Sequence, residues 1–373
     1  MSALDRYEPS LDGMRGVCIA AVVAFHACAQ AGLAGWVRGG FIGVSVFFTL
    51  SGFLITSLLL RERESSGRID LGRFWARRIR RLWPASLAVV LAVVLLSARG
   101  PLAVRSSDAV AATWSVTNWH VIVAGQGRLL ETIVGPLGPT WSLAVEEQFY
   151  IVLAVLLAVT FLGRNPRRVL AVVASAGIVV PVVLANVATD WQPSLEFNTV
   201  LRAPELFVGV LLALWHTGRP AEPRRTALGD LAAGLGLVTM MLLFLFADYS
   251  PPWLLRGGYT AVAAVTALTI AGLLQRGRVA RVVATTPLRL LGVVSYSLYL
   301  VHWPVMSVLT RDRTGMHGVS LVAVHVAVAL AVAVALHLAV ERPIRRLNAS
   351  PRRTFVVGGA AAVGLTVLSM AVL

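Results

Sequence analysis

The stretch MRGVCIAAVVAFHA, residues 14–27, decides the fold class of this chain. It is an apolar run typical of a membrane helix, yet it begins with Arg15 and carries His26 eleven residues later. Eleven residues are three helical turns, so the two side chains share one face, about 16 Å apart along the axis. If Arg15 marks the membrane surface, His26 lies near the midplane, where an ionisable residue is a functional candidate.

The composition extends this interpretation to the whole chain. Of 373 residues, 57% are hydrophobic and 14% are charged, whereas soluble domains carry about 25% charged residues. Apolar blocks fall near residues 14–34, 40–60, 83–98, 108–124, 142–162, 168–189, 200–216, 227–247, 257–274, 288–310, 318–340 and 354–373. This pattern predicts an all-α polytopic membrane protein.

The charge pattern predicts the topology. The net charge is +15 and every basic side chain is arginine, clustered between the apolar blocks as the positive-inside rule expects rather than as in a nucleic-acid-binding protein. The arginine bias favours a cytoplasmic N-terminus and a block 108–124 that does not cross but forms a re-entrant or interfacial segment. We therefore expect about ten transmembrane helices, followed by one more at residues 354–373.

The stretch TWSLAVEEQFY, residues 140–150, places two adjacent carboxylates inside an apolar helix. A glutamate at this depth is costly unless it is paired or protonated. Glu146 and Glu147 point about 100° apart, so one can line a cavity while the other holds a neighbouring residue. The spacing does not say which does which, and a purely structural Glu–Arg pair is the competing interpretation.

The stretch RFWARRIRRLWPA, residues 73–85, carries five arginines at the predicted cytoplasmic surface. Arg78 and Arg81 are three residues apart and share a helix face, so their guanidinium groups are placed to bind phosphate together. Anchoring to anionic lipid explains most such clusters and remains the alternative here.

The stretch SYSLYLVHWPV, residues 295–305, puts Tyr296, Tyr299 and His302 along one face of an apolar helix. An aromatic belt at the membrane interface accounts for the tyrosines but not for His302. No metal-binding or nucleotide-hydrolysis motif occurs in the sequence, so we expect no metal.

Six stretches in order resemble the acyltransferase-3 family of integral membrane O-acyltransferases, across residues 10–345. They are LDGMRGVCIAAVVAFHA, GGFIGVSVFFTLSGFLIT, RFWARRIRRLWPA, TWSLAVEEQFY, SYSLYLVHWPV and ERPIRR. Many members carry Asp where this sequence has Ser45, although Ser also occurs there. The resemblance is to the stand-alone form without a C-terminal SGNH hydrolase-like domain. It predicts an acyltransferase-3 transmembrane domain at residues 1–345 and an additional C-terminal helix at residues 354–373.

The resemblance implies transfer of an acyl group, often acetyl, from cytoplasmic acyl-CoA to a hydroxyl of a carbohydrate, glycolipid or other cell-envelope acceptor. The expected location is a bacterial plasma (inner) membrane. Arg15 and His26 match the family's essential pair, and we expect Glu146, Glu147 and His302 beside them as catalytic residues. Arg78 and Arg81 match its cofactor-binding motif. The other expected cofactor-binding residues are Arg77, Trp141, Tyr150 and Tyr299.

Three other functions stay open from the sequence. The acceptor can be a macrolide or another natural product. A proton-coupled transporter would use His26 and the two glutamates as proton relays, although the sequence shows no inverted repeat. A flippase-like partner of envelope synthesis would bind a glycolipid without catalysis.

Overall fold

The computed structural model describes residues 7–124, 135–187, 196–217, 226–249 and 251–373, and the regular elements within these ranges are all helical. Among the residues that the structure describes, ten helices are long and apolar enough to cross a membrane, or eleven if the bent pair α13 and α14 counts as one span. These findings confirm the predicted all-α polytopic membrane fold.

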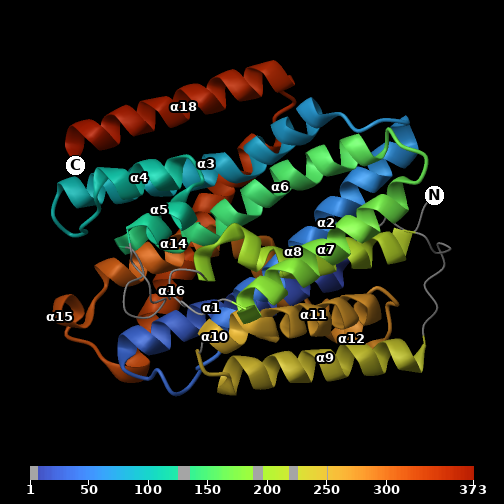
Figure 1. The fold of residues 1–373 in the computed structure, drawn as a ribbon. Coiled ribbons are helices and arrows are strands. Elements are labelled where there is room, and N and C mark those ends of the chain that lie inside the picture. Colours follow the sequence, from blue (N-terminus) through green and yellow to red (C-terminus); the bar gives the residue numbers. More distant parts are fainter. Residues whose placement is uncertain (1–6, 125–134, 188–195, 218–225, 250) are drawn as a thin grey trace.

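The long helices lie side by side, with their axes in roughly one direction (Figure 1). They are α1 (Pro9–Ala31), α2 (Gly43–Ser66), α3 (Leu71–Ala98), α6 (Thr140–Thr160), α7 (Pro166–Val187), α8 (Thr199–Thr217), α9 (Ala227–Phe246), α11 (Tyr259–Leu273), α16 (Gly318–Leu336) and α18 (Pro351–Val372). The shorter ones are α4 (Ser106–Thr113), α5 (Thr117–Val123), α10 (Pro251–Trp253), α12 (Arg278–Val283), α13 (Thr286–Val293), α14 (Ser295–Val308), α15 (Arg311–Thr314) and α17 (Arg342–Arg346). Short 3₁₀-helical turns lie at η1 (Gly40–Ile42) and η2 (Gly135–Leu137), and π-helical turns lie at η4 (Leu254–Gly258) and η5 (His337–Glu341).

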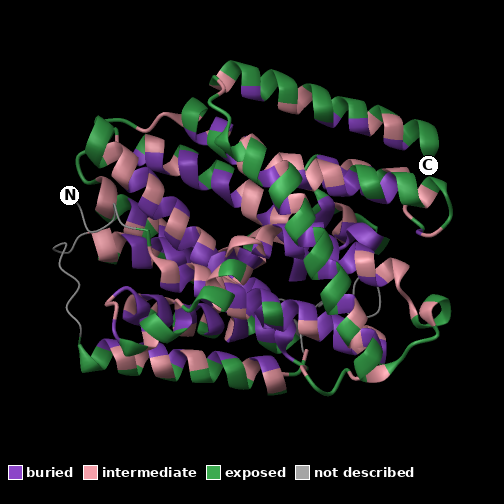
Figure 2. Cartoon of the chain, turned by 180° about the vertical axis from the view of Figure 1, so that it is seen from behind, coloured by how far each residue is buried: buried purple, intermediate pink, exposed green. Residues whose placement is uncertain are grey.

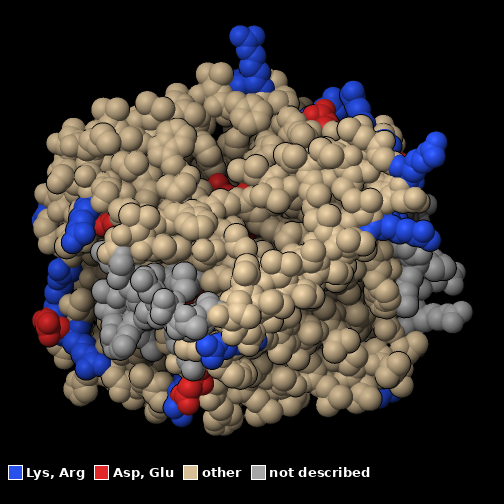
Figure 3. Space-filling view, in the orientation of Figure 1, with Lys and Arg blue, Asp and Glu red and all other residues tan. Residues whose placement is uncertain are grey.

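Burial separates the central helices from the outer ones (Figure 2). The most apolar window of the α2 span is 78% buried, whereas that of α18 is 17% buried. Helix α18 packs along α3 and α4 at one edge (Figure 1) and presents its remaining apolar surface outward. Figure 3 shows a broad uncharged face with most arginines near its two edges, as expected of a surface in contact with lipid.

Glycines let the central helices approach closely. A Cβ added to Gly52 of α2 would lie 2.0 Å from the carbonyl oxygen of Leu206 in α8, and one added to Gly209 would lie 2.2 Å from that of Thr49. Because lipid gives little hydrophobic drive for helix association, such close backbone packing is a main source of affinity between membrane helices.

The apolar block at residues 108–124 does not cross the membrane. It forms α4 and α5, eight and seven residues long, which is too short to span a bilayer. The Asn118 amide donates to the Phe197 carbonyl at 3.1 Å, and His120 Nε2 lies 2.8 Å from Asp108 Oδ1. The segment therefore places its polar side chains against protein, as the arginine bias predicts.

The block at residues 288–310 is bent rather than one continuous helix. Helices α13 and α14 meet at 70° across Val294. Just before the bend, a Cβ added to Gly292 would lie 1.8 Å from the Asp12 carbonyl oxygen of α1. Close contact with α1 thus fixes α13, and the chain turns immediately afterwards to enter the bundle as α14.

Substituting Gly52 tests the α2–α8 contact. Gly52→Ala forces the two backbones apart and should lower the free energy of unfolding by about 1–3 kcal/mol, measured as a lower apparent melting temperature in detergent. Gly359→Ala is the matched control, since no atom lies within 4 Å of its added Cβ. The control should be neutral or slightly stabilising, and equal effects of the two substitutions would contradict the contact.

Candidate active site

A cavity lies between α1, α2, α3, α6 and α14, with about 710 Å³ of empty space including its mouth. Six of the expected catalytic and cofactor-binding residues line it: Arg15, Arg78, Arg81, Glu146, Tyr150 and Tyr299. Its other polar lining residues are Ser51, Ser142, Ser295 and Tyr296. Residues from five helices thus converge on one space inside the bundle.

Three arginines face this cavity. Arg15 lies 3.3 Å from Asp12 Oδ1 and donates to Ser295 Oγ at 2.8 Å. Arg78 is 9% exposed and lies over the Tyr150 ring at 5.5 Å. Among the residues that the structure describes, neither Arg78 nor Arg81 has a carboxylate within 4 Å. The cavity therefore holds more positive than negative charge.

The two adjacent glutamates face different surroundings. Glu146 lines the cavity, where it accepts hydrogen bonds from Ser51 Oγ at 2.8 Å and from the Tyr150 hydroxyl at 2.9 Å. Glu147 turns toward α3 and the segment between α4 and α5, where it accepts from Ser115 Oγ at 2.7 Å and Trp83 Nε1 at 3.3 Å. The ambiguity left by the sequence is resolved, because Glu146 alone of the pair lines the cavity.

His26 and His302 contact each other, and His302 also contacts Tyr299. His302 Nε2 is 3.1 Å from His26 Nδ1, and the two side chains are buried. The His302 ring centroid lies 5.5 Å from that of Tyr299, which lines the cavity while neither histidine does. The Tyr299 hydroxyl is 2.6 Å from Ser142 Oγ and 2.9 Å from the Pro139 carbonyl oxygen. Tyr299 therefore both lines the cavity and contacts one ring of the histidine pair.

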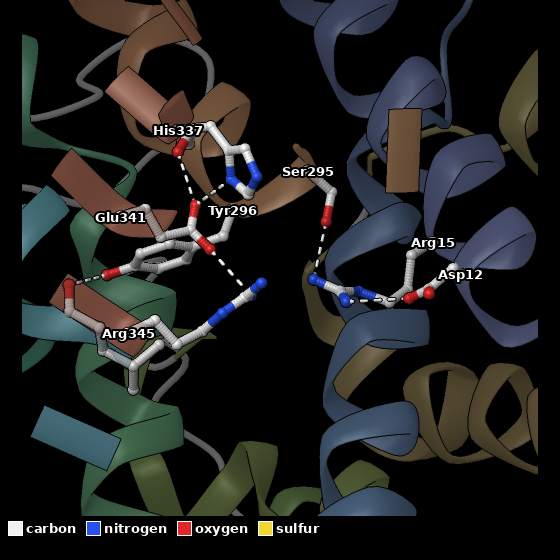
Figure 4. A network of polar contacts seen from close by, with 9 residues as sticks. Asp12, Arg15, Ser295, Tyr296, His337, Glu341 and Arg345 are labelled. Carbon is white, nitrogen blue, oxygen red and sulfur yellow. Dashed lines mark hydrogen bonds and ion pairs between the residues drawn. The ribbon is translucent and has the colours of Figure 1, made fainter. Parts of the chain in front are cut away.

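A polar network holds the beginning of α14 in place (Figure 4). Glu341, in the π-helical turn η5, accepts from Ser297 Oγ at 2.8 Å and lies 2.9 Å from His337 Nδ1. Tyr296 donates to the Leu82 carbonyl at 2.6 Å. Together with the Arg15–Ser295 contact, these bonds tie α14 to α1, α3 and η5.

Two other expected cofactor-binding residues lie away from the cavity lining. Arg77 is 42% exposed and pairs with Glu62 at 2.7 Å. Trp141 packs against the rings of Phe48 and Phe197 at 6.1 and 5.1 Å and under the guanidinium of Arg202 at 5.3 Å. The structure thus separates Arg77 from its neighbour Arg78 in the sequence.

Comparison with known proteins identifies the family. The profile of the family described as "Acyltransferase domain" matches residues 8–340. The chain belongs to this acyltransferase family. The peptidoglycan O-acetyltransferase OatA of Listeria monocytogenes is 35% identical over 82% of this chain and 50% of its own length. The O-acetyltransferase OatA of Staphylococcus aureus is 31% identical over 91% of this chain and 58% of its own length.

The chain thus spans about half the length of the curated acyltransferases that it matches. No solved structure gives a significant match. The family nevertheless agrees with the resemblance seen in the sequence, and it covers the cavity and the histidine pair.

A buried ion pair next to the cavity was not predicted from the sequence. Arg202 and Glu205 of α8 are 2% and 0% exposed and form two hydrogen bonds, at 2.7 and 2.9 Å. Arg202 also donates to Ser45 Oγ at 3.1 Å and lies 3.7 Å from the centroid of the Tyr259 ring. Two opposite charges three residues apart at the start of an apolar block were the available signal. An aspartate at position 45, as in many members, would meet this arginine.

Glu196 lies near this ion pair, outside the membrane-spanning helices. Its side chain is fully buried, and burial raises its pKa to about 7, although the Tyr249 hydroxyl donates to it and Arg202 is nearby. This carboxyl therefore changes charge near neutral pH, unlike an exposed glutamate.

Removing one partner tests the buried ion pair. Glu205→Leu leaves Arg202 without its carboxylate and should destabilise the protein by about 3–5 kcal/mol, read as a large fall in apparent melting temperature. Adding Ser45→Asp to Glu205→Leu should recover part of the loss, because the new carboxylate lies beside Arg202. A Glu205→Leu protein as stable as the parent would contradict this role.

Proposed function

We propose that this chain is a membrane O-acyltransferase that moves an acyl group, most simply acetyl, from acyl-CoA to a hydroxyl of a cell-envelope carbohydrate. The observation that carries the proposal is the excess of buried and partly buried guanidinium groups over carboxylates around the cavity. Burying a charge inside a membrane bundle is costly unless an opposite charge compensates it. An anionic substrate supplies that compensation, and family membership selects an acyl donor among such anions.

The donor fits the distribution of charge along the cavity. Phosphates of coenzyme A carry the negative charge that Arg78 and Arg81 lack, and guanidinium groups bind phosphate bidentately. The narrower pantetheine arm then runs between α3, α6 and α14 toward Tyr299. Arg15, held by Asp12 and Ser295, faces the same space and stabilises the donor's negative charge.

His26 is the proposed group that reacts. In one route, its ring takes the proton of the acceptor hydroxyl while the hydroxyl oxygen attacks the thioester carbonyl. The carbon–sulfur bond then breaks, and the departing thiolate receives a proton. In the other route His26 accepts the acyl group itself and passes it to the acceptor. Either route needs side chains such as Tyr299 to move, because Tyr299 lines the cavity and contacts His302 while neither histidine lines the cavity.

The glutamates take different parts in this proposal. Glu146 faces the cavity together with Arg15, Arg78 and Arg81, so it orients guanidinium groups or carries a proton. Glu147 holds the α4–α5 segment against α6 through Ser115 and does not meet the donor.

The proposed acceptor is based on the names of the similar proteins. Since the similar Listeria protein is named a peptidoglycan O-acetyltransferase, we propose a sugar hydroxyl of a peptidoglycan-like polymer as acceptor. The arginine distribution supports a cytoplasmic N-terminus in a bacterial plasma membrane, which brings the arginine end of α3 to the side where acyl-CoA is made.

Neutralising the cavity arginines tests donor binding. Arg78→Ala and Arg81→Ala should each raise the KM for acetyl-CoA about 10- to 100-fold, because each removes hydrogen bonds to a charged group. Arg73→Ala is the matched control on the same helix, since Arg73 is 69% exposed and pairs with Asp70. An unchanged KM in both cavity variants would argue for a non-catalytic partner protein instead.

Removing His26 tests the chemistry. Purified wild-type protein should release coenzyme A from radiolabelled acetyl-CoA and label a peptidoglycan fragment, whereas His26→Ala should lose at least about 100-fold in rate. A transporter would consume no thioester in either form. Full transfer by His26→Ala would refute the mechanism.

A further inference from the structure

The contact between His26 and His302 determines which of their ring nitrogens carry hydrogen, a point that the proposed function leaves open. His302 belongs to α14 and is 0% exposed, and His26 belongs to α1 and is 7% exposed. Their ring centroids are 5.1 Å apart with planes tilted by 32°. Phe25 and Trp303 contact the His26 ring edge-on at 5.0 and 5.1 Å. Packing therefore restricts how the His26 ring can rotate.

The backbone fixes the protonation of His302. Its Nδ1 lies 2.6 Å from the carbonyl oxygen of Tyr299. A carbonyl oxygen only accepts, so His302 Nδ1 carries a hydrogen and donates it. In the neutral ring the other nitrogen, Nε2, then has a free lone pair and acts as an acceptor.

That acceptor in turn fixes His26. His26 Nδ1 lies 3.1 Å from His302 Nε2, and two bare nitrogens would repel each other at this distance. The hydrogen of neutral His26 is therefore on Nδ1, and its Nε2 keeps the lone pair. The chain of donors runs from His26 through His302 to the backbone of Tyr299.

We infer that His302 is a positioning residue that holds His26 in the Nδ1–H tautomer, so that His26 Nε2 is the nitrogen that reacts. This inference rests on the proposed function for its kinetic consequence. It also separates the roles of the two rings, because both nitrogens of His302 are already engaged and only His26 offers a free lone pair.

The proton balance is the same in both proposed routes. When His26 Nε2 takes the acceptor's proton or the acyl carbon, the ring becomes positively charged. The His26 Nδ1–H then donates a stronger hydrogen bond to His302 Nε2, or transfers its proton to that nitrogen. In either case His302 Nδ1 keeps its hydrogen and donates it to the Tyr299 carbonyl. In the base route, the leaving thiolate takes one proton from the pair. In the acyl-carrier route, the acyl group passes from His26 Nε2 to the acceptor oxygen, and the proton of the acceptor hydroxyl goes to the thiolate. Both rings end neutral in each route. An orienting acceptor behind a histidine base is the arrangement that serine hydrolases obtain from an aspartate.

Nitrogen NMR of histidine-labelled protein in detergent reads the tautomer directly. The His26 signals are assigned by their loss in His26→Gln. The wild type should show His26 with hydrogen on Nδ1 and a bare Nε2. His302→Leu should move the hydrogen to Nε2 or mix the two forms, whereas His302→Gln, whose amide oxygen accepts near the position of Nε2, should restore the wild-type pattern.

Kinetics give the second readout. His302→Leu should lower kcat about 100-fold with an unchanged KM for acetyl-CoA, and His302→Gln should recover to within about 10-fold of the wild type. His325→Leu is the control, because His325 is also buried and one of its ring nitrogens bonds to a backbone carbonyl. This bond joins His325 Nε2 to the Leu309 carbonyl oxygen at 2.8 Å. It should keep the wild-type kcat.

The outcomes separate this inference from the proposed function. A wild-type His26 with its hydrogen on Nε2 overturns the inference whatever the activity is. So does a His302→Leu protein with the wild-type kcat. Wild-type protein with the expected tautomer but no consumption of acetyl-CoA would refute the proposed function and leave the tautomer assignment standing.

Discussion

The placement of buried and partly buried guanidinium groups around one cavity of a membrane-spanning bundle is the constraint on which the rest of this structure depends. Arg15, Arg78 and Arg81 face one cavity that contains a single glutamate of the predicted pair. A charge that is withdrawn from water must be hydrogen-bonded or compensated by an opposite charge. Ser295 and Asp12 meet this need for Arg15. The remaining positive charge makes the cavity receptive to an anion.

The packing of α1 and α14 follows from the same requirement. Arg15 bonds to Ser295 at the start of α14, and Glu341 in η5 bonds to Ser297 two residues further along. These contacts hold α14 so that Tyr299 lines the cavity and His302 meets His26. One polar network therefore positions both the cavity arginines and the histidine pair. In the proposal, the anionic donor binds at the arginines and the acyl group reacts at the histidines.

Helix periodicity and the distribution of arginines along the sequence predicted features that do not depend on contacts between distant segments. The shared face of Arg78 and Arg81 and the non-crossing segment at 108–124 both appear in the structure. Contacts between segments that are distant in the sequence could not be predicted in this way. The choice between Glu146 and Glu147 depends on Ser51 and Ser115, from other helices.

The histidine contact and the buried ion pair show the same limit. His26 and His302 are 276 residues apart in the chain, so no local pattern announces that they meet. Arg202 and Glu205 stand at the edge of an apolar block, where the charges resemble an ordinary helix end. Their burial comes from α2 and α11, which pack on α8.

The most direct test of the central claim is a cryo-electron microscopy structure of the protein with a non-hydrolysable acetyl-CoA analogue. Density for the analogue is expected in the cavity, with phosphate against Arg78 and Arg81 and the acyl end at Tyr299. Density for the analogue at another site, with the arginine cavity unchanged at saturating concentration, would contradict it.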